Sequence, residues 1–188
     1  MYSIEQFRAE SSGESTHAAK SPETGRNAIR AMADAVGDLY AVPRHSGGLT
    51  RVNVSTIDAG QVINVIASDA TVEGEVRGET AELLRSMQGR ADRVLAGAAR
   101  MHDCEVETET VGKAPSAESD DSFADRVYGV IDGMKRVTSL VQRADFGTSE
   151  DAAWLMNAAG DAGGRTTHVI IGTDHPTGHH APAFDVDE

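Results

Sequence analysis

The sequence predicts an α+β protein, in which an antiparallel β-sheet carries two helices on one face and is followed by a partial α/β segment. Three observations support this prediction. β-Branched runs separated by turn residues cluster between residues 50 and 77. Two longer stretches place apolar residues at the spacing of amphipathic helices. Beyond residue 112 helix and strand patterns alternate, which is typical of α/β folds. The expected domains are therefore 1–112 and 113–188.

Residues 2–10 form the first expected strand, because apolar residues alternate there with polar ones. A helix is expected over residues 22–39, since Pro22 suits a first helical turn and apolar residues follow at helical spacing. His17 lies in the loop before this helix, where a rigid element can hold a side chain that still meets a ligand. A lone histidine in a loop is more often only a surface residue. The apolar positions of the helix are Ala28, Ile29, Met32, Ala33, Val36 and Leu39.

Three consecutive strands are expected at 50–57, 62–67 and 70–77, because β-branched residues dominate each stretch and short polar turns separate them. A second amphipathic helix follows over 80–102. A closing strand at 105–111 alternates Val and Thr with Glu. The two helices would cover one face of the sheet, which leaves the other face free to meet a partner.

The second part of the chain is expected to begin with a helix over 121–133. A strand at 135–144, a helix at 149–159 with Ser149 as its N-cap, and a buried apolar strand at 166–171 would follow. Two helices and two strands are too few to stand alone. This segment is therefore predicted to be the back part of a larger domain.

The chain is acidic, with 30 Asp and Glu against 17 Lys and Arg and a net charge of −13. Nucleic acid and anionic membranes are poor partners for it, because phosphate binding needs clustered basic residues. An acidic, lysine-poor surface is typical of a protein that works in high salt, because salt screens the repulsion between like charges. Cys104 is the one cysteine, which excludes an intrachain disulfide and fits a reducing compartment. No signal peptide or membrane-length apolar span is recognised, so the cytoplasm is the expected location.

The stretch GHHAPAFDVDE, from Gly178 to Glu188, gathers imidazoles and carboxylates that can hold a divalent metal. His179 and His180 are adjacent and would point to opposite faces of a strand, so one metal ligand is expected here rather than two. A complete site needs three or four ligands. A solvated acidic end of the chain explains the same residues equally well.

Several motifs resemble one known family. THAAKSPETGRNAI at 16–29, PRHSGGLTRVNV at 43–54 and NVIASDATVEGEVRGET at 64–80 resemble the dimerisation (lid) domain of the dinuclear-metal aminoacylase and glutamate carboxypeptidase family. GTSEDAAWLM at 147–156, together with the sequence that follows from Gly163, is similar to that family's C-terminal catalytic segment. Family members carry a long catalytic portion ahead of the lid, which supplies most metal ligands and the general base.

The resemblance implies roles for four residues. His180 takes the place of a C-terminal metal ligand, and His17 that of an oxyanion stabiliser that reaches into the partner subunit's site. Asn64 and Arg77 lie thirteen residues apart, at the ends of the expected strand pair, and match the groups that hold a substrate carboxylate. A guanidinium fork suits that task because it binds carboxylates with two prongs. Roles for Glu150 and His179 stay open.

By resemblance, the function is hydrolysis of the amide bond of N-acyl or p-aminobenzoyl amino acids, with two zinc or manganese ions in the complete enzyme. The partners implied are a second subunit, in a homodimer or heteromer joined through the lid, and a small amide substrate. The 188 residues alone should be inactive, because one histidine ligand cannot assemble the site. Two alternatives stay open: a non-catalytic dimerisation module or truncated product, and an acidic metal-binding protein that uses only the His-Asp tail.

Overall fold

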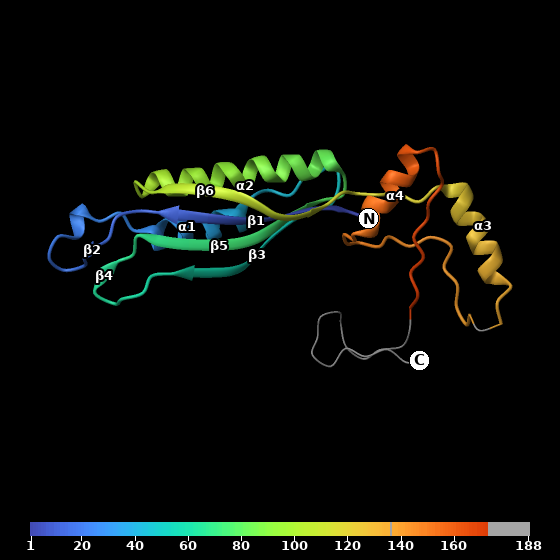
Figure 1. The fold of residues 1–188 in the computed structure, drawn as a ribbon, viewed down its shortest axis with the longest axis horizontal. Coiled ribbons are helices and arrows are strands. Elements are labelled where there is room, and N and C mark those ends of the chain that lie inside the picture. Colours follow the sequence, from blue (N-terminus) through green and yellow to red (C-terminus); the bar gives the residue numbers. More distant parts are fainter. Residues whose placement is uncertain (136, 173–188) are drawn as a thin grey trace.

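The computed structural model describes residues 1–135 and 137–172, and a four-stranded antiparallel sheet forms its centre. The strands lie in the order β3-β5-β1-β6, so strands distant in sequence are neighbours (Figure 1). The predicted antiparallel sheet is confirmed. Its strands are β1 (Ser3–Ser12), β3 (Thr50–Ala59), β5 (Asp69–Gly78) and β6 (Glu105–Ala114).

Helices α1 (Ala28–Ala41) and α2 (Ala81–Met101) pack against each other and against one face of the sheet, as predicted. Their apolar faces and the inward strand positions form one core, because side chains alternate between the two faces of a strand. Among the described helices, none is long and apolar enough to cross a membrane. The core includes Phe7, Met32, Leu39, Val72, Val76, Met87 and Leu95.

The opposite face of the sheet is polar. Arg8 on β1 lies between Glu73 on β5 and Glu109 on β6, with guanidinium-to-carboxylate distances of 2.7 and 3.2 Å. The Arg8 guanidinium holds the pKa of the Glu73 carboxyl below its usual value. This face therefore stays open to solvent through paired charges, as the alternating strand pattern predicts.

The first helix begins later than the sequence pattern indicates. Pro22 opens a short 3-10 turn, η1 (Pro22–Thr24), and α1 starts only at Ala28. Asn27 caps α1, because its side-chain oxygen accepts hydrogen bonds from the amides of Ile29 and Arg30 at 3.0 and 3.3 Å. The prediction of a helix from residue 22 was therefore wrong at its start, since the stronger cap lies five residues further on.

The predicted strand at 62–67 does not enter the main sheet. Only β4 (Val65–Ile66) is extended there, and it pairs with β2 (Thr16–His17) in a separate two-stranded sheet. β3 and β5 are direct neighbours instead. The expected antiparallel pairing between the strand that follows Asn64 and the strand of Arg77 was therefore wrong. We call β2, β4 and the turn at 60–64 the tip, which projects from one end of the sheet (Figure 1).

The chain after β6 packs at the other end of the sheet, where α3 (Asp121–Asp132) and α4 (Ala152–Asp161) lie (Figure 1). Both predicted helices are confirmed. Ser149 is not the N-cap of α4, however, because Asp151 precedes the helix and the buried Ser149 hydroxyl has no hydrogen-bond partner in the described part of the chain. The small core of this part joins Ala117, Ala153 and Met156, with Met1 packed against them.

The two strands predicted for this part do not form within the described residues. Residues 137–144 contain no regular element. Residues 166–171 are likewise without strand pairing, although the Thr166 carbonyl accepts a hydrogen bond from the amide of Asp120 at 2.8 Å. An apolar β-branched run becomes a strand only where a neighbouring strand meets its backbone groups, and neither run has one here.

Candidate functional site

His17 lies on the tip with its ring exposed. Its Nδ1 accepts a hydrogen bond from the backbone N–H of Ala19 at 3.1 Å. Nδ1 is therefore the acceptor nitrogen of the ring, which leaves Nε2 to act as the donor. The His17 carbonyl accepts bonds from the amides of Lys20 and Ser21 at 3.2 and 3.4 Å, which fixes the turn. An oriented and exposed Nε2–H is the kind of donor that stabilises a developing oxyanion.

Asn64 adjoins His17 on the tip. Its carbonyl accepts a hydrogen bond from the Ala18 amide at 3.0 Å, and the residue itself is exposed. Its neighbours Val62 and Ile63 are also exposed, with relative accessibilities of 57% and 105%. Exposed apolar side chains gathered at one place are typical of surfaces that bind another molecule. The tip presents a polar pair, His17 and Asn64, beside these exposed apolar side chains.

Arg77 lies near the other end of β5, on the open face of the sheet. Its Nε donates to Oε1 of Glu75 at 2.7 Å, and its Nη1 donates to the hydroxyl of Thr148 at 2.9 Å. These two bonds orient the guanidinium, whose side chain remains 26% accessible. Among the described residues none accepts a hydrogen bond from Nη2, so this edge of the fork is available to a carboxylate.

The structure brings His17 and Asn64 together and separates both from Arg77. Strand β5 runs from Asp69, beside the tip, to Arg77, a step of eight residues. At roughly 3.4 Å per residue this amounts to about 27 Å. The tip and the C-terminal helices accordingly lie at opposite ends of the sheet (Figure 1). A small acyl amino acid cannot touch both ends of one chain.

Two contacts at the Arg77 end were not predicted. The Tyr2 hydroxyl donates to Oδ2 of Asp145 at 2.5 Å. This bond raises the pKa of Tyr2 to about 12 and lowers the pKa of the Asp145 carboxyl. The Tyr2 amide also donates to the carbonyl of Thr148 at 2.9 Å. No sequence motif marks these residues, because the contact depends on how the loop of residues 145–148 meets β1.

The described residues do not themselves form a metal site. The predicted ligand His180 and its neighbour His179 lie outside them. Glu150 is exposed just before α4. Across residues 1–135 and 137–172, no three His, Cys, Asp or Glu side chains come close enough to share a metal ion. A catalytic zinc ion is typically held by three protein ligands.

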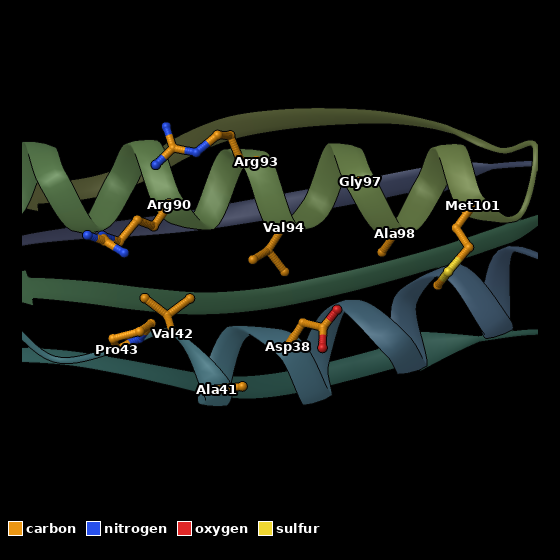
Figure 2. A pocket seen from close by; sticks show the side chains of 10 residues that line it. All are labelled: Asp38, Ala41, Val42, Pro43, Arg90, Arg93, Val94, Gly97, Ala98 and Met101. Atoms are coloured by element: carbon orange, nitrogen blue, oxygen red, sulfur yellow. The ribbon is translucent and has the colours of Figure 1, made fainter.

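A groove of about 520 Å³ runs between α1 and α2, on the side of the helices that faces away from the sheet (Figure 2). None of the predicted site residues lines it. Figure 2 shows that Arg93 turns away from α1, whereas Arg90 leans toward Val42. The tip and the Arg77 end therefore remain the candidate site. The groove is lined by Asp38, Ala41, Val42, Pro43, Arg90, Arg93, Val94, Gly97, Ala98 and Met101.

The chain thus forms a four-stranded sheet with two helices on one face, and the predicted site residues lie at two distant ends of this sheet. Comparison with known proteins identifies its family. Residues 3–100 match the peptidase dimerisation domain, and the chain belongs to this family. The resemblance that the motifs at 16–29, 43–54 and 64–80 indicate is thereby confirmed.

The chain is 33% identical over 176 residues to a p-aminobenzoyl-glutamate hydrolase homolog of Haemophilus influenzae, covering 94% of this chain and 42% of that protein. It is 37% identical over 189 residues to the indole-3-acetyl-aspartic acid hydrolase of Enterobacter agglomerans, covering 97% and 42%. The aminobenzoyl-glutamate utilization protein of Klebsiella pneumoniae superposes with a TM-score of 0.78 at 34% identity, covering 88% and 42%. The chain therefore spans less than half the length of these relatives.

Proposed function

We propose that these residues are the lid and C-terminal segment of an amide hydrolase that acts on N-acyl or p-aminobenzoyl amino acids. The names of two relatives support this class of substrate, because p-aminobenzoyl-glutamate and indole-3-acetyl-aspartate each join an acyl group to an acidic amino acid. The observation that carries the proposal is the placement of an oriented His17 Nε2–H at one end of the sheet and a held Arg77 fork at the other.

Pairing of two chains through β3 would bring these two ends together. β3 and β6 are the edges of the sheet. β6 presents three glutamates within its first five residues, which oppose pairing with another strand. β3, with the sequence TRVNVSTIDA, carries only two charged residues. The less charged edge, beside α1, is therefore the proposed contact between subunits.

An antiparallel contact of β3 with its own copy has two-fold symmetry, the commonest arrangement of soluble dimers. The Ala59 end of one strand then lies beside the Thr50 end of the other. The first end leads to the tip with His17, and the second lies opposite the end of β5 that holds Arg77. In such a dimer each site would combine the tip of one chain with Arg77 of its partner.

In the composite site Arg77 would hold the carboxylate of the amino-acid half of the substrate through paired hydrogen bonds. His17 from the other chain would donate from Nε2 to the amide carbonyl oxygen as negative charge develops on it. Asn64 would donate its side-chain amide beside His17. Zinc or manganese, which activate water in reactions of this kind, would need ligands beyond the described residues, and the resemblance assigns His180 to that set.

We also keep the cytoplasm as the proposed location. Cys104 is a free, buried thiol, and free thiols persist in reducing compartments. Burial raises the pKa of the Cys104 thiol, so it stays protonated and unreactive. The thiol is therefore part of the core rather than of the site.

A subunit-mixing assay tests the composite site. The 188 residues replace the segment that they match in the Enterobacter hydrolase, and release of aspartate from indole-3-acetyl-aspartate is measured. His17→Ala should lower kcat by at least about 100-fold, as removal of an oxyanion donor does. Arg77→Ala should raise KM. Lys20→Ala, on the same turn as His17, should keep full activity.

Mixing the His17→Ala and Arg77→Ala chains should restore about a quarter of the activity, because about half of random dimers are mixed and each mixed dimer holds one intact site. Absence of recovery would show that His17 and Arg77 do not combine across two subunits and would overturn the composite arrangement. The competing function, a dimerisation module without chemistry, predicts instead that dimers form while activity is independent of His17.

A further inference from the structure

Arg51 on β3 lies directly opposite Arg77 on β5 in the antiparallel register. Residues opposite each other in such a pair point to the same face of the sheet, with Cβ atoms about 5 Å apart. That face is the open one, because the next residues along the two strands, Val52 and Val76, are buried in the core. Two arginine side chains therefore leave the same face of the sheet, at the end where the substrate carboxylate is proposed to bind.

The side chains of Arg51 and Arg77 differ in their hydrogen-bond partners. Arg77 is fixed by Glu75 and Thr148. Arg51 is exposed, and its Nη1 donates only to the carbonyl of its own neighbour Thr50, at 3.2 Å. Within residues 1–135 and 137–172, no carboxylate forms an ion pair with it. Arg51 is thus a cation without a fixed counter-ion next to a second cation.

Three acidic groups at this end of the sheet already accept hydrogen bonds. The Glu75 carboxylate accepts from Arg77, and that of Asp145 accepts from the Tyr2 hydroxyl and the Gly147 amide. Glu79 accepts from the amide of Leu49 at 2.8 Å. Like charges directly opposite each other destabilise a sheet. Among the described residues, this arrangement leaves the Arg51 guanidinium and Nη2 of Arg77 available to an added anion.

We propose that Arg51 and Arg77 together form a subsite for an amino acid with two carboxylates, in which Arg77 binds the α-carboxylate and Arg51 the side-chain carboxylate. The inference rests on the proposed function and narrows it to amides of glutamate and aspartate. Each guanidinium presents a planar fork that matches one carboxylate. An amide of a neutral amino acid would leave Arg51 without its partner and would bind less tightly.

A binding experiment on the full 188-residue chain tests the inference without the need for turnover. N-Benzoyl-L-glutamate and N-benzoyl-L-glutamine are titrated separately into the labelled protein, and dissociation constants are taken from NMR chemical-shift changes. The two ligands differ only at the side-chain carboxylate. Wild-type chain should bind the glutamate compound about tenfold more tightly, as expected for a hydrogen bond to a charged group. Arg51→Gln should abolish this preference, and Arg51→Lys should retain part of it.

Arg30→Gln serves as the matched control, because it removes the same charge from an exposed position at the start of α1, near the tip. It should leave the tenfold preference intact. Loss of preference in Arg30→Gln as well would assign the effect to overall charge and overturn the inference. Equal binding of the two ligands by wild type, or no binding of either, would overturn it too. Since no hydrolysis is measured, these outcomes are distinct from failure of the subunit-mixing assay.

Discussion

Arg77 donates from Nη1 to the hydroxyl of Thr148 at 2.9 Å, across a sequence separation of 71 residues. The bond joins the sheet of the dimerisation domain to the loop ahead of α4. Tyr2 makes a second junction through Asp145, and the amino group of Met1 a third through the Ala117 carbonyl at 3.0 Å. The fork proposed to bind substrate is therefore positioned by both parts of the chain at once.

The junction at Tyr2 should respond to pH. The pKa of Tyr2 rises from 10.0 to about 12 on folding, so its contribution to stability is complete below pH 10 and is lost as the pH rises through 12. The pKa of the Asp145 carboxyl falls below 3.8, so its contribution is present above that pH and is lost as the pH drops through the lowered value. Melting temperatures of Tyr2→Phe should therefore decline less than those of wild type between pH 10 and 12.

Tyr128→Phe is the control for this experiment, because the Tyr128 hydroxyl makes no hydrogen bond within the described residues. It should follow the wild-type profile. Indistinguishable alkaline profiles for wild type and Tyr2→Phe would show that the Tyr2 to Asp145 bond does not stabilise the fold.

The first part of the chain should fold without the second. Its core draws on α1, α2 and the four strands, whereas the core of the second part joins only a few residues. The expected boundary at residue 112 falls inside β6, which continues to Ala114, so a fragment of residues 1–114 is the one to express. Limited proteolysis of the whole chain should leave a product of this size. A resistant C-terminal product with a digested sheet would contradict the proposed division.

Leu95 on α2 is 1% accessible and lies in the main core. Leu95→Ala should lower the free energy of unfolding by about 2 to 5 kcal/mol, because it removes buried methyl groups and leaves a cavity. Leu155→Ala on α4 is the matched control: this leucine is 75% accessible, and its loss should cost under about 0.5 kcal/mol. Urea denaturation of both variants measures the difference, and equal losses would place Leu95 outside the cooperative core.

The helix α2 and the four strands of the main sheet could be predicted because local patterns determine them. α2 begins after Thr80 and ends before His102, almost at its expected bounds, since its apolar stripe and cap are read from neighbouring residues. The stretch 62–67 could not be placed in this way. Its composition favours a strand, but which strand it joins depends on β3 and β5 meeting each other over their full lengths.

Local sequence patterns are limited in the same way for the candidate site. The motifs identify His17, Asn64 and Arg77, but the distance between them follows from the length and register of β5. The motif at 43–54 contains Arg51 but indicates no role for it, because its position opposite Arg77 exists only once β3 and β5 pair. Tyr2 and Asp145 meet across a separation of 143 residues, which no local pattern encodes.

Self-association through β3 should strengthen with salt, because salt screens the repulsion between acidic chains. Sedimentation at about 0.1 M and about 1 M salt should show a larger dimer fraction at the higher concentration. Ile57→Asp places a charge on the β3 edge and should weaken the dimer. Val111→Asp on β6 is matched, since the two side chains are 53% and 50% accessible, and it should leave the dimer intact. If Val111→Asp weakened the dimer and Ile57→Asp did not, the contact between subunits would lie at β6. If only monomer were found in high salt, the proposed dimer would be excluded.

Arg77→Lys distinguishes substrate binding from a purely structural role. In the chimeric hydrolase the variant should stay folded but lose roughly 2 to 3 kcal/mol in kcat/KM, mostly through KM, because a point charge replaces a two-pronged donor. If Arg77 only joins the sheet to Thr148, the variant should instead lower the melting temperature and leave KM unchanged. Thr148→Val tests the structural role by itself. It removes the 2.9 Å hydrogen bond between Nη1 of Arg77 and the Thr148 hydroxyl and leaves the Arg77 guanidinium in the protein.

A substrate that lacks the carboxylate completes the comparison. Its kcat/KM should already be low with wild type and should fall no further in Arg77→Lys, because the interaction that the substitution weakens is absent from it. Thr148→Val should likewise leave this substrate unaffected, because the position of the fork matters only to a substrate whose carboxylate binds it. An equal loss for both substrates in Arg77→Lys would remove Arg77 from the binding site, and Arg51 would then lose the neighbour on which its own proposed role depends.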